Sequence, residues 1–100
     1  MIIRIVKLNI KPSEIKNFKD IFNLNKNKIL GFKGCIDVNL LQEKRNESIF
    51  FTYSKWESLN SIEDYRNSDI FKSIWSSVKP FFNEKAQAWS LDQINHIQKP

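Results

Sequence analysis

The sequence predicts an α+β fold of the ferredoxin-like type, with the element order β-α-β-β-α-β. Four segments have the residue alternation or the β-branched content of strands, and two regions between them repeat apolar residues at helical spacing. The chain has 100 residues, 41% of them hydrophobic and 27% charged, and only two glycines, which suits one globular domain. This order predicts a four-stranded antiparallel sheet with both helical regions on one face.

The first strand is predicted over residues 2–10, "IIRIVKLNI", and is rich in β-branched residues. Its apolar residues fall on both faces, which indicates a strand covered on both sides. One face carries Ile2, Val6, Leu8 and Ile10, and the other carries Ile3 and Ile5. "KPS" then breaks the strand, and an amphipathic helix is expected over residues 13–27.

Gly31 and Gly34 mark the turn into a second strand, "CIDVNLLQ", whose alternation predicts one buried face. A polar connection, "EKRNES", leads to a third strand over residues 48–56. A short helical face with Leu59, Ile62 and Tyr65 follows, and a longer one runs from Ile70 to Phe82. The last strand is expected over residues 85–94. The domain therefore spans residues 1–94, and residues 95–100 form a tail.

The first and third predicted strands carry large apolar residues on the face that the helices leave bare. An exposed apolar surface of that size is unusual for a monomer. We therefore expect this face to pack against a second copy of the chain in a homodimer.

The net charge of +5 raises the question of nucleic-acid binding. Residues 1–50 hold ten Lys and Arg against five Asp and Glu, whereas residues 51–100 hold six of each, and most aromatics lie in the second half. Single-strand binders interleave the two kinds of residue. The third strand also lacks the basic-Gly-aromatic run of RNA-recognition domains, although the element order is the same. No nucleic-acid partner is expected.

The sequence also argues against disulfide-bonded, zinc-binding, membrane-spanning and secreted proteins. Cys35 is the only cysteine and His96 the only histidine, so neither a disulfide nor a zinc site is predicted. No apolar run reaches the roughly 20 residues of a membrane span, and the first residues do not resemble a signal peptide. We expect a cytoplasmic protein with no membrane partner and no metal.

Five segments together resemble a known family. A strand that ends in Trp56-Glu57-Ser58 is followed by a short helix, by "SDIFKSIW" and by the strand "AQAWSL". The glycine-led "GFKGCIDVNL" follows the first helix. This arrangement resembles the antibiotic biosynthesis monooxygenase (ABM) family of dimeric α+β barrel proteins over residues 2–94. The resemblance implies that a ligand binds between the helices and the sheet.

Two kinds of activity occur in that family, and the resemblance allows each to be compared with this sequence. The haem-degrading members have a haem-ligating histidine where this chain has Trp75, a tryptophan at Tyr65 and an asparagine at Ile5. An indole nitrogen cannot ligate iron, because its lone pair belongs to the ring. Haem degradation is therefore not expected. Many quinol-oxygenating members have a histidine where this chain has Tyr65.

The function implied by the resemblance is a cofactor-independent monooxygenase acting on a small phenolic or quinol-like aromatic substrate. Such chemistry requires an apolar pocket and a group that stabilises a phenolate. The candidates for phenolate stabilisation are Tyr65 and Arg66, and those for the pocket are Ile5, Asn9, Phe22, Phe71 and Trp75. A non-catalytic dimeric small-molecule binder on the same scaffold is the alternative. Tail residue His96 is not expected to be catalytic.

Overall fold

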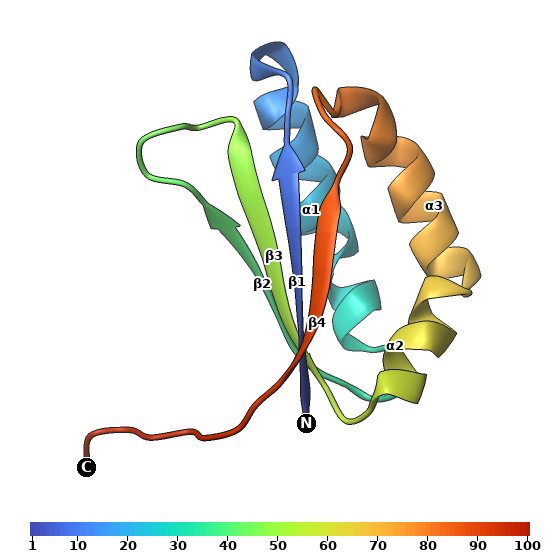
Figure 1. Ribbon diagram of the computed structural model, residues 1–100. Coiled ribbons are helices and arrows are strands. Elements are labelled where there is room, and N and C mark those ends of the chain that lie inside the picture. The colour runs from blue at the N-terminus through green and yellow to red at the C-terminus, as the bar shows by residue number, and fades with distance from the viewer.

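The computed structural model describes residues 1–100 and contains one sheet and three α-helices, which confirms the predicted α+β ferredoxin-like fold (Figure 1). Strand and helix order along the chain is β-α-β-β-α-α-β, because the second helical region is divided in two. The strands are β1 Ile2–Asn9, β2 Cys35–Gln42, β3 Ile49–Trp56 and β4 Gln87–Asp92. The helices are α1 Ile15–Leu30, α2 Leu59–Arg66 and α3 Asp69–Val78, with single 3-10 turns at Pro12–Glu14 and Lys79–Phe81.

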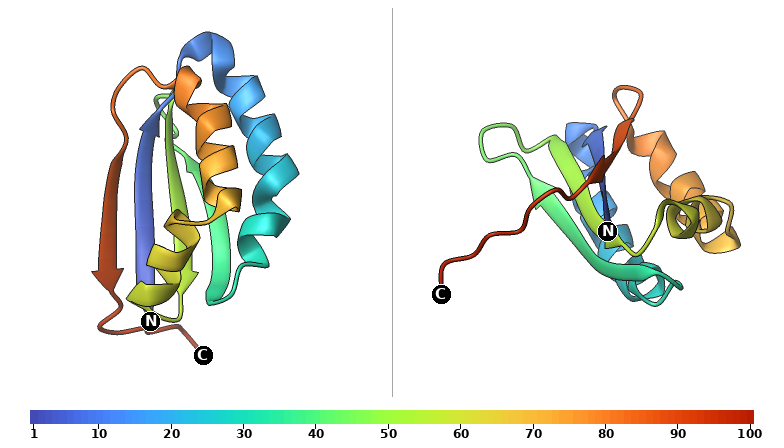
Figure 2. Two further views of the ribbon diagram at one scale, coloured as in Figure 1. Left: turned by 90° about the vertical axis from the view of Figure 1, so that its right-hand side faces the viewer. Right: turned by 60° about the horizontal axis from the view of Figure 1, so that its bottom comes forward.

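The four strands lie in the order β2-β3-β1-β4, and every neighbouring pair is antiparallel. The two strands next to each other in the centre, β1 and β3, are therefore distant in sequence, as the ferredoxin-like topology requires. All three helices cover one face of this sheet and leave the other face open (Figure 2). Directly paired residues share a face of the sheet, so the register determines which side chains meet the helices.

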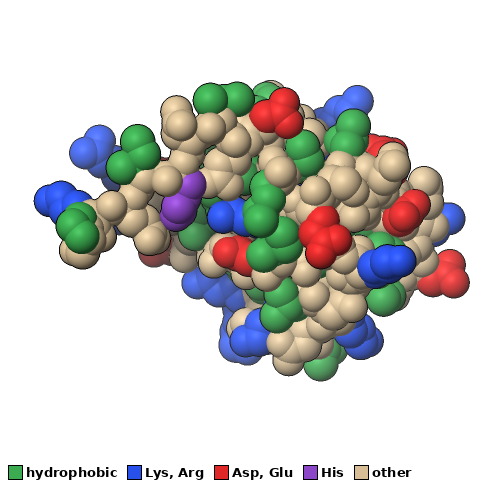
Figure 3. Space-filling model, turned by 90° about the horizontal axis from the view of Figure 1, so that it is seen from below, with side chains coloured by type: hydrophobic (Ala, Val, Ile, Leu, Met, Phe, Trp, Pro, Cys, Tyr) green, Lys and Arg blue, Asp and Glu red, His purple; other side chains and the backbone are tan.

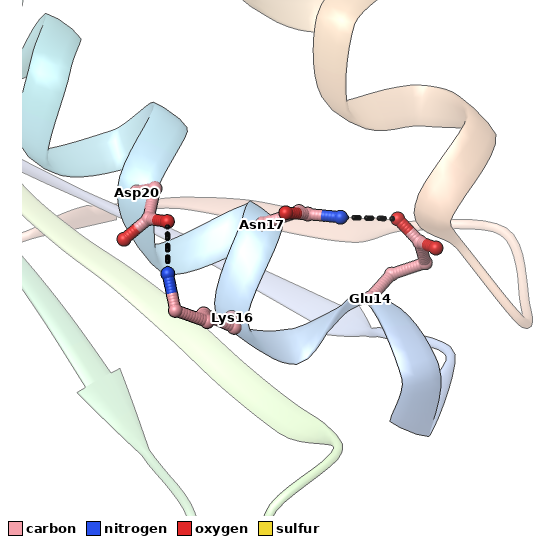
Figure 4. A network of polar contacts seen from close by, with 4 residues as sticks. All are labelled: Glu14, Lys16, Asn17 and Asp20. Atoms are coloured by element: carbon pink, nitrogen blue, oxygen red, sulfur yellow. Dashed lines mark hydrogen bonds and ion pairs between the residues drawn. The ribbon is translucent and has the colours of Figure 1, made fainter.

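Helix α1 begins after the 3-10 turn that Pro12 starts, and it continues to Leu30, three residues beyond the predicted end. Its exposed first turns carry a Lys16–Asp20 ion pair at 2.9 Å and an Asn17 amide that donates to Glu14 at 3.2 Å (Figure 4). Leu24 of this helix points outward, with 77% of it exposed.

Two serines begin the two later helices. Ser58 Oγ accepts a hydrogen bond from the Ser61 amide at the start of α2, and Ser68 Oγ accepts one from the Phe71 amide at the start of α3. Each cap satisfies an amide that has no partner within its helix. The short break between α2 and α3 is therefore a defined turn, at which the chain changes direction over the sheet.

One cluster of buried side chains lies at the end of the sheet near the start of α1. Phe18 of α1 and Phe50 of β3 are in contact, with their ring centroids 4.9 Å apart. They belong to one cluster with Leu8, Ile10 and Val78. This cluster joins β1, β3, α1 and α3, so it holds both helical regions against the sheet.

The open face of the sheet is apolar at its centre and along β4. Ile5 of β1 pairs with Tyr53 on one side and with Trp89 on the other. Trp89 and Leu91 remain 43% and 44% exposed. Beyond β4, residues 93–100 have no regular secondary structure, and this tail projects from the body of the molecule (Figure 3). None of the helices has both the length and the apolar character that crossing a membrane requires.

Candidate functional site

A cavity of about 370 Å³ lies between the helices and the sheet. This volume falls within the range of small-molecule sites. Sixteen of its twenty lining residues are hydrophobic, and they come from all four strands and all three helices.

One wall of the cavity is a continuous row of aromatic side chains. The ring centroids of Trp56 and Tyr65 are 5.1 Å apart, those of Tyr65 and Phe71 are 5.3 Å apart, and Phe71 stacks on Trp75 at 5.6 Å. Phe82 continues the row with an edge-on contact to Trp75 at 5.3 Å. Aromatic faces of this kind favour a flat, aromatic ligand.

Five of the predicted site residues line this cavity: Phe22 of α1, Tyr65 and Arg66 of α2, and Phe71 and Trp75 of α3. Trp75 forms part of the wall, and the cavity remains open beside it. The apolar stripe that recurs at helical spacing in residues 56–82 therefore packs on the sheet and also lines the cavity.

The other two predicted pocket residues, Ile5 and Asn9, do not line this cavity. The cavity is lined from β1 by Arg4, Val6 and Leu8, and side chains alternate between the two faces of a strand. Ile5 and Asn9 therefore lie on the open face of the sheet, where Ile5 pairs with Trp89. A shift of one residue along a strand reverses the face, so Ile5 and Arg4 point to opposite sides of the sheet.

Arg4 is the site residue that the sequence reasoning missed. It stands in the register row Val38–Ser54–Arg4–Ser90, which crosses the sheet beneath the helices. Its Nη1 donates a hydrogen bond to Ser90 Oγ at 3.0 Å. The sequence contained a sign of this position, because Arg4 is the one charged residue on a strand face that is otherwise apolar. The apolar residues of that face are Ile2, Val6, Leu8 and Ile10.

The two arginines of the cavity lie close enough to repel each other. Burial lowers the pKa of the Arg4 guanidinium, the nearby Arg66 lowers it further, and Glu63 raises it. Arg66 itself pairs with Glu63 at 3.3 Å, one turn earlier on α2, and about half of its side chain is exposed. Arg66 therefore lies at the solvent edge of the cavity, whereas Arg4 lies on its floor.

Tyr65 is a neutral hydrogen-bond donor over the physiological pH range. Burial raises the pKa of its phenol to about 12, and the neighbouring Cys35 adds to the shift, because two anions there would repel each other. Its hydroxyl makes no hydrogen bond within the chain, although the ring is packed against Phe32, Trp56 and Phe71. The hydroxyl is consequently free to donate to a ligand.

The remaining candidates for reactive chemistry are inert or distant. Burial raises the pKa of the Cys35 thiol, so it is protonated at neutral pH, and its Sγ lies 3.9 Å from the Asp37 carbonyl oxygen. His96 is exposed in the tail. No group of three or more histidine, cysteine, aspartate or glutamate side chains gathers anywhere in the structure.

The polar groups of the cavity can donate hydrogen bonds but cannot accept a proton. Its lining residues include no carboxylate, no histidine and no lysine. A guanidinium stays protonated in proteins, and Tyr65 is a phenol whose pKa is about 12. The serine and threonine hydroxyls are not bases at neutral pH. The site can therefore bind and stabilise an anion, but it holds no general base.

Fold and site together define a small ferredoxin-like α+β protein with an aromatic cavity between its helices and its sheet. The sequence pattern of the family described as antibiotic biosynthesis monooxygenase (ABM) matches residues 1–75. The chain belongs to the ABM family. The match includes Tyr65, Arg66, Phe71 and Trp75, so most of the cavity lies within the part of the chain that defines the family.

Solved structures agree with this assignment at the level of the fold. A candidate antibiotic biosynthesis monooxygenase from Nitrosomonas europaea superposes with a TM-score of 0.88 at 15% identity, over 95% of this chain and all of the other. A conserved protein from Methanosarcina mazei gives 0.85 at 25% identity, over 91% of each chain. Rv0793 from Mycobacterium tuberculosis gives 0.87 at 10% identity, over 97% and 98%. No curated protein matches the sequence.

Proposed function

We propose that this protein is a cofactor-independent monooxygenase that acts on a small phenolic or quinol-like aromatic substrate. The observation that carries the proposal is the aromatic cavity of about 370 Å³ with Tyr65 and Arg66 in its lining. Membership of the ABM family agrees with it, because its name is that of a monooxygenase family.

The chemistry asks for a site that excludes water and favours the ionised substrate. An electron-rich phenolate or enolate passes an electron to O₂, and the resulting pair of radicals combines into a peroxide on a carbon that bears hydrogen. The peroxide takes up a proton from solvent, and its outer oxygen leaves as water with the hydrogen of that carbon, so that a carbonyl remains. One oxygen atom enters the product and the other leaves as water, so the substrate supplies all of the electrons. The apolar wall of Phe22, Phe71 and Trp75 suits the ring, and it excludes bulk water from the reacting carbon.

Tyr65 and Arg66 are assigned to the oxygen of the substrate. The Tyr65 hydroxyl is free to donate, and its raised pKa keeps the proton on the phenol, so it stabilises a phenolate without being deprotonated by it. Arg66 adds a positive charge at the solvent edge, where a ligand enters. Neither residue removes the substrate proton, so the substrate must ionise by virtue of its own acidity.

ABM proteins are generally dimeric, and this agrees with the open face of the sheet. We propose that two copies pack sheet against sheet through the apolar surface around Ile5, Trp89 and Leu91. The cavity lies on the other face of each sheet, so each copy would carry its own site.

A non-catalytic binder of small aromatic molecules is a second candidate. The specific observation in its favour is that no lining residue can accept a proton. A binder needs only the apolar wall and the hydrogen-bond donors. The two candidates therefore differ in turnover and not in the ligand that they select.

Consumption of O₂ with a panel of quinols and anthrones separates them. The monooxygenase proposal predicts uptake above the rate of autoxidation for at least one member, and Trp75→Ala should reduce it by opening the wall. Tyr65→Phe should lower the rate about ten-fold, because a hydrogen bond to a charged oxygen contributes about 1.5 kcal/mol or more.

Tyr53→Phe is the matched control for Tyr65→Phe. It removes the same hydroxyl from the chain's other tyrosine, which pairs with Ile5 on the open face of the sheet. Its O₂ uptake should equal that of the unmodified protein. If no compound of the panel is consumed faster than it autoxidises, while aromatic ligands still bind, the protein is a binder and not a monooxygenase.

A further inference from the structure

We infer that the cavity selects an aromatic ligand that is already an anion in water, such as an aromatic carboxylate, and that Arg4 on the floor of the cavity pairs with its charge. The inference rests on the proposed function, since it names the substrate class of the same cavity.

Arg4 is a half-buried cation without an ionic partner. The chain contains two ion pairs, Lys16–Asp20 and Glu63–Arg66, and Arg4 is in neither of them. Its side chain makes one hydrogen bond, to Ser90 Oγ, although a guanidinium has five N–H donors. A charge that is partly removed from water loses part of its hydration, and a partner of opposite charge compensates for that loss. A ligand anion would supply the missing partner.

The charged groups around Arg4 favour an anion. Arg66 and Glu63 of α2 are the two whose charges act on Arg4, and Glu63 is already paired with Arg66. The three side chains together carry a net charge of +1, from two arginines and one glutamate. An anion that enters beside Arg4 would offset the repulsion between the two guanidinium groups. A guanidinium also matches the two oxygens of a carboxylate with paired donors.

The composition of the lining points the same way. It includes two arginines and no carboxylate, so no group of the cavity repels an anionic ligand. A ligand with a carboxylate brings its negative charge from solution and offers it to Arg4. The predicted substrate class is therefore a hydroxylated aromatic carboxylate, with its ring along Phe71 and Trp75 and its carboxylate on Arg4.

Arg4 could also be purely structural, holding β1 to β4 through Ser90. The two roles differ in what they require from the side chain. The bond to Ser90 needs a donor, whereas an anion needs a positive charge. Arg4→Gln keeps a donor and removes the charge, and Arg4→Lys keeps the charge.

The test uses two ligands of nearly the same shape, naphthalene-2-carboxylate and the neutral naphthalene-2-carboxamide, with affinities measured by isothermal titration calorimetry. The unmodified protein should bind the carboxylate about ten-fold or more tightly than the amide, because charge-assisted bonds are roughly twice as strong as neutral ones. Arg4→Gln should remove this preference, and Arg4→Lys should keep part of it. Arg45→Gln, in the exposed connection between β2 and β3, is the control and should not change it.

Three results would overturn the inference: equal affinity for the two ligands, no binding of either, or a preference that survives in a folded Arg4→Gln variant. Circular dichroism of each variant establishes that it is folded. O₂ uptake distinguishes this failure from failure of the proposed function. A carboxylate preference without turnover of any quinol contradicts only the monooxygenase, whereas turnover of neutral quinols without a carboxylate preference contradicts only the inference.

Discussion

The rings of Trp56 and Tyr65 are 5.1 Å apart between centroids, and this contact joins the end of β3 to the last turn of α2 at the cavity wall. Trp56 is almost fully buried, with 1% of its surface exposed. The contact buries the Tyr65 phenol against an aromatic surface that cannot solvate a negative charge. This environment is the main reason that the pKa of Tyr65 is raised to about 12.

The first prediction concerns stability at high pH. Because the folded pKa of Tyr65 lies above that of a free tyrosine, near 10, the unfolded chain loses this proton first. The contribution of Tyr65 to the free energy of unfolding is therefore complete below pH 10 and is lost as pH rises toward 12. The expected loss is about 2 to 3 kcal/mol.

Urea unfolding of the unmodified protein and of Tyr65→Phe between pH 8 and 12 measures this effect. The unmodified protein should lose more stability than the variant across the upper part of that range. The difference in tyrosinate absorbance between the two folded proteins should show one group titrating near 12. Titration of that group near 10 would contradict the burial argument.

The second prediction is that Ser54→Ala destabilises the protein by about 1 to 3 kcal/mol, because it leaves a buried donor without a partner. Trp56 Nε1 donates to Ser54 Oγ at 2.9 Å in the interior. Chemical unfolding at one fixed protein concentration measures the change. Ser77→Ala, which removes an exposed hydroxyl bonded to the Ser73 carbonyl oxygen, is the control and should change stability by about 0.5 kcal/mol or less. Equal effects of the two substitutions would show that the buried bond is not important.

The third prediction concerns Gly34, which has a positive φ of 90°. A Cβ at this position would overlap the side chain of Ser61 in α2, and L-residues are strained at such a φ. Gly34→Ala should therefore destabilise the protein by about 2 kcal/mol or more in urea unfolding. Gly31→Ala is the matched control, because Gly31 has an ordinary φ of −76°. A Gly34→Ala variant as stable as Gly31→Ala would contradict the close packing of α2 on this turn.

The fourth prediction concerns the open face of the sheet. The protein should have twice the mass of the 11.9 kDa chain in light scattering at micromolar concentration. Trp89→Glu places a charge at the centre of the proposed interface and should shift the mass toward that of one chain. Leu24→Glu, on the exposed side of α1, should leave it unchanged. A monomeric unmodified protein would contradict the proposed dimer.

The sequence by itself determined the fold class and the residues that build each helix and strand. The alternation in residues 38–41 and the stripe from Ile70 to Val78 depend on local periodicity, which is the same in the isolated segment and in the folded chain. A register shift between Cys35 and Asp37, which local periodicity does not reveal, interrupts the alternation and leaves Ile36 39% exposed. The aromatic wall could be predicted for the same reason. Phe71 and Trp75 are one helical turn apart, so they had to share a face of α3.

Only the tertiary structure decided which face of β1 meets the helices. Both faces of this strand are apolar, so periodicity alone could not distinguish them, and the site was placed on Ile5 instead of Arg4. The register of β1 with β3 and β4 resolves this point by setting Arg4 between Ser54 and Ser90. Whether a charged residue of a strand faces solvent or a binding site depends on which elements cover that face of the sheet. Here α2 and α3 enclose Arg4 in an apolar cavity, and no carboxylate of the chain pairs with it.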